Sequence, residues 1–287
     1  MFDVEAVKAR VTGDIRKLNA RLLEVAKQLE KEMAAHEVCK TPPGLIAHAF
    51  YRKCVRSFEA IEIIKKCRLY EEAWILLRVL LETHVNLLYF LRHDPVEMSR
   101  RYSDAAVLDK LKHLREVNFY EGTPIESEIR RKEFEKADKE IAGRYDKSAL
   151  ESLKKHGFSG VSFEKRSKAV GLKSMYEYCY RIASRSIHSF DPAETKMLAA
   201  YVEKGYKAEL LKSRRLTLES VANMLLGRVS YIIATLVKSP LSPELFLLGV
   251  GYEKFRDAKG SVLEVKVEES SKLKIDGDDE EVYIWRE

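Results

Sequence analysis

The segment from Ala73 to Leu91 constrains the fold more than any other part of the chain, because it is almost continuously apolar over the length of a membrane-spanning helix. Polar side chains nevertheless interrupt it: Arg78, Glu82, His84 and Asn86. Together they would cost too much free energy in hydrocarbon. We therefore predict a helix in the core of a soluble protein, with no membrane partner.

The N-terminal part of the chain carries a long amphipathic pattern. Its apolar positions step by threes and fours: Val7, Val11, Ile15, Leu18, Leu22, Val25 and Leu29. This spacing predicts one helix from about Asp3 to about His36, which Thr41-Pro42-Pro43-Gly44 ends. The apolar seam would fit either the body of the protein or a second copy of the chain.

Helical periodicity continues through most of the sequence. Helices are predicted at 45–66, 70–92, 96–119, 124–142, 173–188, 193–211 and 217–237, with a weaker, partly irregular stretch at 147–170. The expected fold class is therefore all-α, a multi-helix bundle. Its three parts would be a long N-terminal amphipathic helix (1–40), the helical bundle (41–240), and a linker with a short β tail (241–287).

After Ser239-Pro240 and Ser242-Pro243 the helical periodicity of the sequence ends. Short β-prone runs flank Asp276-Gly277, and this dipeptide is a hairpin signal. We predict a small C-terminal β-hairpin appendage. This tail and the N-terminal helix are the two places where a protein partner is expected to bind.

Composition and motifs exclude several classes of function. The formal net charge is +6, from 51 basic and 45 acidic residues, which permits a polyanionic partner without requiring one. The four cysteines show no C-x-x-C spacing and the polar start has no signal-peptide core, so we expect reduced thiols in the cytoplasm. The sequence contains no glycine-rich nucleotide-binding motif, no G-x-S-x-G motif of a hydrolase nucleophile and no H-E-x-x-H metal-binding motif. No metal or cofactor is predicted.

The best candidate for chemistry is the run from Tyr180 to His188. Seven helical steps separate Arg181 from His188, so both side chains would project from one face, with Ser184 between them. Such a face could hold a phosphate and move a proton. The spacing alone is expected by chance, and Arg78-x5-His84 also matches it, but six steps leave that pair on different faces. A surface arginine and a histidine at a helix C-terminus are the structural alternative.

Supporting residues are predicted on two segments. Arg185 could add a second phosphate contact, and Tyr180 could stack on a base, although tyrosines beside apolar neighbours more often pack. On the apolar helix, Arg78, Glu82 and Asn86 step by four. This row either closes an ion pair at the rim of the core or supports the Arg181 site.

Two stretches of the chain resemble an uncharacterised family of bacterial all-helical proteins. The first is Leu69-Tyr70-Glu71-Glu72-Ala73 leading into Leu77–Glu82, and the second is Tyr180-Arg181-x-x-Ser184-x-x-x-His188. That family is in turn similar to the HEPN superfamily of toxins, ribonucleases and phage-defence effectors. The resemblance covers about Leu45 to Lys238. It implies that Arg181 and His188 match an R-x(4-6)-H ribonuclease motif at a homodimer interface. Many superfamily members have Asn, Asp or His directly after the arginine, where this chain has Ile182.

The leading hypothesis is a dimeric, metal-independent endoribonuclease acting in bacterial stress or phage defence, with Arg181 and His188 catalytic. The alternatives are a non-catalytic helical interaction protein, or a module that senses RNA or a nucleotide.

Overall fold

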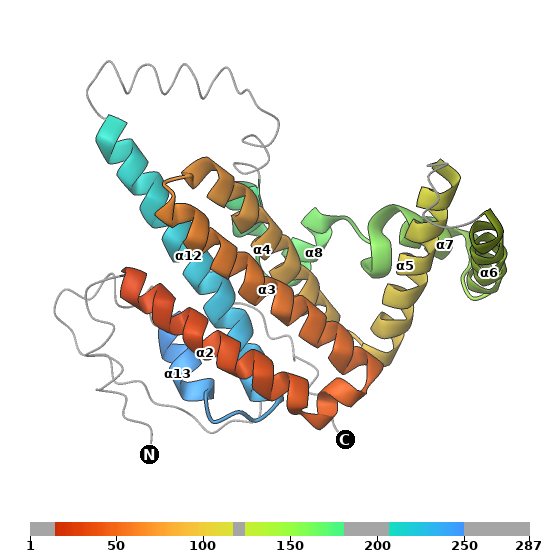
Figure 1. Ribbon diagram of the computed structural model, residues 1–287, viewed down its shortest axis with the longest axis horizontal. Coiled ribbons are helices and arrows are strands. Elements are labelled where there is room, and N and C mark those ends of the chain that lie inside the picture. The colour runs from red at the N-terminus through yellow and green to blue at the C-terminus, as the bar shows by residue number, and fades with distance from the viewer. Residues whose placement is uncertain (1–14, 117–123, 181–206, 250–287) are drawn as a thin grey trace.

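The computed structural model describes residues 15–116, 124–180 and 207–249. Over these ranges every regular element is helical and none is a strand, which confirms the predicted all-α class. The elements are α2 (Ile15–Ala35), η1 (Glu37–Lys40), α3 (Pro42–Lys66), α4 (Tyr70–Leu91), α5 (Pro95–Glu116), α6 (Pro124–Ala142), α7 (Lys147–His156), η2 (Gly157–Ser159), α8 (Phe163–Ala169), α9 (Lys173–Met175), η3 (Tyr176–Tyr180), α12 (Lys207–Leu236) and α13 (Ser242–Gly249). Figure 1 shows α2, α3, α4, α12 and α13 gathered in one body, from which α5 leads out to α6 and α7.

Helix α4 lies at the centre of the main core. Its apolar side chains are buried against α3, α8 and α12, and the aromatic Phe90 is fully buried. Among the described residues it is the one helix long and apolar enough to cross a membrane, but 61% of its most apolar window is buried inside the protein. Such burial is typical of the core helix of a soluble protein.

The apolar seam of α2 packs on the body of the chain itself. Leu18, Leu22, Val25 and Leu29 are buried, and the helix contacts α3, α12 and α13. Of the two uses that the periodicity left open, this intramolecular packing is the one that the structure shows. Residues 3–14 of the predicted helix lie outside the described residues.

Residues 41–44 begin a helix as well as following one. The Thr41 hydroxyl accepts a hydrogen bond from the Gly44 amide, and Pro42 occupies the first helical position, where its missing N–H costs nothing. Helix α3 therefore begins three residues before the predicted boundary at Leu45.

The predicted linker at 241–287 needs correction at its start, because residues 242–249 form α13. Leu245 and Leu248 are fully buried against the bundle, and Glu244 pairs with Arg21 of α2 at 2.7 Å. Gly227 of α12 and Gly249 of α13 meet backbone to backbone, since a Cβ on Gly227 would lie 2.1 Å from the Gly249 Cα. Pro243 lies in the first turn, where proline favours a helix. The predicted hairpin itself lies outside the described residues.

A second, smaller core supports the α5–α7 arm. Leu108, Ile141 and Leu153 are buried together, one each from α5, α6 and α7. Beside them Asp104 accepts hydrogen bonds from Arg144 and the Tyr145 hydroxyl, both at 2.9 Å. The three helices of the arm therefore share a small core of their own.

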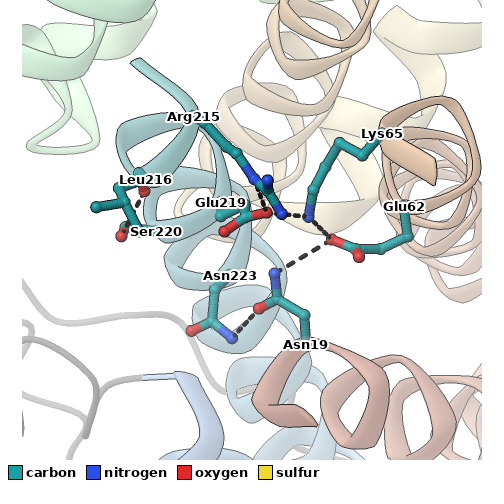
Figure 2. Close-up of polar contacts among 8 residues, drawn as sticks. All are labelled: Asn19, Glu62, Lys65, Arg215, Leu216, Glu219, Ser220 and Asn223. Carbon is teal, nitrogen blue, oxygen red and sulfur yellow. Dashed lines mark hydrogen bonds and ion pairs between the residues drawn. The ribbon is translucent and has the colours of Figure 1, made fainter. Parts of the chain in front are cut away.

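A chain of buried polar side chains joins α2, α3 and α12 (Figure 2). Lys65 lies between two carboxylates, with its Nζ 2.8 Å from Glu62 and 3.1 Å from Glu219. Arg215 also reaches Glu219, and Asn19 links Glu62 to Asn223 on the apolar part of α12. The two positive and two negative charges balance, and their mutual attraction offsets the free energy that their removal from water costs.

We expect Lys65→Ala to destabilise the fold strongly, because it leaves two half-buried or buried carboxylates without their shared cation. Breaking one partner of a buried pair costs about 3 kcal/mol or more. The neighbouring Lys66 is exposed, so Lys66→Ala is the matched control. Urea unfolding followed by circular dichroism measures both, and equal free energies of unfolding would show that the Lys65 pairs contribute nothing.

Candidate functional site

The polar row of α4 lies at the rim of the core. Arg78 donates from Nε to the Glu82 carboxylate at 2.9 Å, and both side chains are partly exposed. This i,i+4 ion pair is one of the two arrangements that the spacing allowed. Asn86 follows on the same side of α4, half-buried, and its Oδ1 has no hydrogen-bond partner among the described residues.

Arg78 also reaches across to the residue that precedes Arg181. Its Nη2 donates to the Tyr180 hydroxyl at 2.7 Å, and its Cζ lies 4.2 Å from the centroid of the Tyr180 ring. Burial raises the pKa of Tyr180, while the adjacent Arg78 acts in the opposite direction. The phenol is therefore neutral at pH 7 and fixed against α4.

Tyr180 belongs to a group of three aromatic rings in mutual contact, of which Tyr176 and Tyr180 are stacked. Its ring centroid lies 5.1 Å from that of Tyr176 and 4.8 Å from that of Phe163. Tyr176–Tyr180 is a π-helical turn, a form that is rare and frequent at functional sites. Tyr178, on the same turn, points away and is 53% exposed.

A second arginine borders this group from α8. Arg166 donates from Nη1 to the carbonyls of His156 and Val161 and to the Ser159 hydroxyl, and its Cζ lies 5.7 Å from the Phe163 ring. Burial lowers the pKa of Arg166, and the nearby Tyr89, Glu82 and Tyr180 act against that shift. We define the Arg78 cluster as Arg78, Glu82, Phe163, Arg166, Tyr176 and Tyr180.

The Arg78 cluster could recognise an anion beside an aromatic group. Nη1 of Arg78 has no hydrogen-bond partner among the described residues, so a charge-assisted donor is left for a ligand. Among those residues, no group of three or more His, Cys, Asp or Glu side chains could hold a metal ion.

The structure brings together three of the predicted site residues: Arg78, Glu82 and Tyr180. The others, Arg181, Ser184, Arg185 and His188, lie outside the described residues. Arg166 and Phe163 were missed because they lie in a stretch with weak periodicity, where an arginine among lysines looks like a solvated charge.

The second R-x(4-6)-H match is not a site. His84 is fully buried on the face of α4 that packs on α12, with Nδ1 2.9 Å from the Leu225 carbonyl oxygen. Burial, assisted by the positive charge of Arg228, lowers the pKa of His84 to about 3. The imidazole is thus neutral at physiological pH and is turned away from Arg78.

A comparison with known families decides the affiliation of the chain. Residues 44–199, more than half of its length, match a family of unknown function, DUF5677. The chain belongs to this family. The expected membership of an uncharacterised family is thereby confirmed, and no curated protein or solved structure is significantly similar. The DUF5677 region contains the whole Arg78 cluster, whereas the buried polar chain of Figure 2 also draws on α2 and α12, outside the match.

We expect Tyr180→Phe to lower the free energy of unfolding by about 1 kcal/mol, because the Arg78 guanidinium loses its hydroxyl acceptor while the ring stack is kept. Tyr178→Phe is the control, since that side chain is exposed. Urea titrations of both variants make the measurement, and a Tyr180→Phe curve that overlays the control would mean that the contact adds no stability.

Stability is expected to fall in acid through His84. Because its folded pKa is about 3 against an ordinary value of 6.5, the unfolded chain binds a proton over this interval that the folded chain does not. Its contribution is complete above pH 6.5 and is lost as the pH falls toward 3, with a slope of up to about 1.4 kcal/mol per pH unit. His84→Gln should show a shallower decline than the parent protein between pH 6.5 and 4.5, and parallel curves would contradict the assignment.

Proposed function

We propose that this DUF5677 protein is a cytoplasmic, metal-independent endoribonuclease-like effector of bacterial stress or phage defence, related to the HEPN superfamily and acting as a homodimer. The observation that carries the proposal is the hydrogen bond from Arg78 to Tyr180. It ties the polar row of α4 to the residue directly before Arg181, and so to the start of the segment in which an arginine and a histidine are seven positions apart.

In the proposed reaction His188 takes the proton from the ribose 2′-hydroxyl or gives one to the leaving 5′-oxygen. The attacking 2′-oxygen forms a bond to phosphorus as the bond to the 5′-oxygen breaks, which leaves a 2′,3′-cyclic phosphate. Arg181 would stabilise the negative charge of the pentacovalent phosphorane, and Arg185 would add a second contact. Ser184 stands between Arg181 and His188 in the sequence.

Arg78 and Glu82 would act as positioning residues in this scheme. Glu82 holds the Arg78 guanidinium from one side, and Arg78 holds the Tyr180 hydroxyl from the other. Fixing Tyr180 would restrict the backbone directly before Arg181. The burial of His84 supports the choice of Arg181 and His188 over the other spacing match, because a histidine with a pKa near 3 is a poor proton carrier at neutral pH.

The alternative function is a non-catalytic module that senses RNA or a nucleotide, or that binds a protein partner. It is favoured by the chemistry of the Arg78 cluster. Nη1 of Arg78 is left for an anion beside aromatic rings, and the cluster contains no histidine that could transfer a proton. A site of this kind predicts binding without turnover.

Cleavage of a labelled single-stranded RNA in the presence of a chelator tests the proposal. We expect the purified protein to produce 2′,3′-cyclic ends, and His188→Ala and Arg181→Ala to reduce the rate at least about 100-fold, the range of a lost general acid or base. Arg56→Ala, an exposed arginine of α3, is the control. Equal rates in all four proteins would remove Arg181 and His188 from consideration, and binding without cleavage would favour the sensor.

A further inference from the structure

The segment from α7 to α9 concentrates the positive charge of the protein. Residues 147–173 contain seven lysine or arginine residues and two acidic ones, so about a tenth of the chain supplies +5 of a formal net charge of +6. An excess of positive charge of this size on one short segment creates a local positive electrostatic potential, although the net charge of the whole chain is small for its length.

The fold turns these charges outward. Apolar side chains of the segment are buried, among them Leu153, Phe158, Val170 and Leu172. The lysines are all exposed: Lys147, Lys154, Lys155, Lys165, Lys168 and Lys173. We call these six residues the lysine face.

The backbone that carries the lysine face is held by arginines. Arg101 of α5 donates to the Phe158 carbonyl at 2.8 Å, and Arg92 donates to the Ala169 carbonyl. Together with Arg166, these side chains satisfy carbonyls that an irregular segment cannot pair within itself. The lysines are thus presented on a fixed scaffold.

No lysine of this face forms an ion pair with a residue in the described ranges. Elsewhere Lys27 pairs with Glu59 and Lys132 with Glu128, and the buried Lys65 is shared between two carboxylates (Figure 2). Six like charges that two acidic residues of the segment compensate only in part repel one another, which favours binding of an external polyanion.

Two lysines of this face lie on the same helix as two members of the Arg78 cluster. Lys165 and Lys168 are three residues apart, on one side of the helix α8 that also carries Phe163 and Arg166. After Lys173 the chain enters the π-helical turn, where the exposed Tyr178 offers a ring. Proteins bind single-stranded nucleic acid with positive charges placed along the path of its phosphates and with aromatic rings on which its bases stack.

We propose that the lysine face binds the phosphates of single-stranded RNA and leads the strand to the Arg78 cluster, with a base stacked on Tyr178. The inference rests on the proposed function for its choice of RNA. Duplex RNA, whose bases are already stacked, would gain nothing from Tyr178.

The test measures the anisotropy of a labelled 2′-O-methyl oligouridine, which the enzyme cannot cleave because it lacks the 2′-hydroxyl. The variant K154Q/K155Q/K165Q/K168Q is expected to bind at least about tenfold more weakly. Its dependence of log affinity on log salt concentration should be shallower by about 0.7 for each phosphate contact removed. The control K17Q/K31Q/K53Q/K66Q removes the same charge from exposed positions on α2 and α3 and should change affinity less than about twofold.

Tyr178→Leu separates stacking from charge: it should weaken binding several-fold with an unchanged salt slope. Equal losses in the two lysine variants, no loss in either, or binding to phosphatidylserine vesicles but not to the oligouridine would overturn the inference. Cleavage assays on unmodified RNA distinguish the two proposals. Cleavage without the lysine effect rejects the lysine face alone, and the lysine effect without cleavage rejects the nuclease alone.

Discussion

The burial of α4 is the constraint on which the rest of this structure depends. A helix this apolar must be covered on nearly every side, and α3, α12 and the α8–η3 segment provide the cover. Its few polar positions then have narrow choices. Arg78 and Glu82 emerge at the rim beside Tyr180, while His84 is enclosed and stays neutral. The candidate site therefore lies where the charged side chains of α4 emerge from the core.

A second constraint is the buried polar chain that joins α2 to the bundle. Apolar contacts alone would tolerate sliding of α2 along α3 and α12, because a heptad-like seam repeats. The contacts of Asn19 with Glu62 and Asn223 allow one register, and Lys65 fixes α3 to α12 through Glu219 (Figure 2). These contacts specify how α2, α3 and α12 pack against one another.

The helices were predictable wherever apolar periodicity was strong, as in α3 and α4, because the pattern is local. The failures lie where local signals compete. The two Ser-Pro pairs suggested a linker, yet the apolar residues after Pro243 gain enough from burial to form α13. Lys65 stands beside Lys66 in the sequence, a pair of charges that usually faces water, and only its contact with Glu219 of α12 shows why it can be buried. Arg166 carried no signal, since its partners are carbonyls of a loop.

The sequence by itself determined that the described part of the chain is helical, which segments form the central helices, and that Arg78, Glu82 and Asn86 share one side of α4. These follow from spacing along a single chain segment. Only the tertiary structure decided that Arg78 meets Tyr180, 102 positions away, that Lys65 bridges Glu62 and Glu219, and that the lysines of α7 to α9 have no acidic partners among the described residues. The physical reason is that periodicity reports which face of a helix is buried, whereas the partner on that face depends on how distant helices pack.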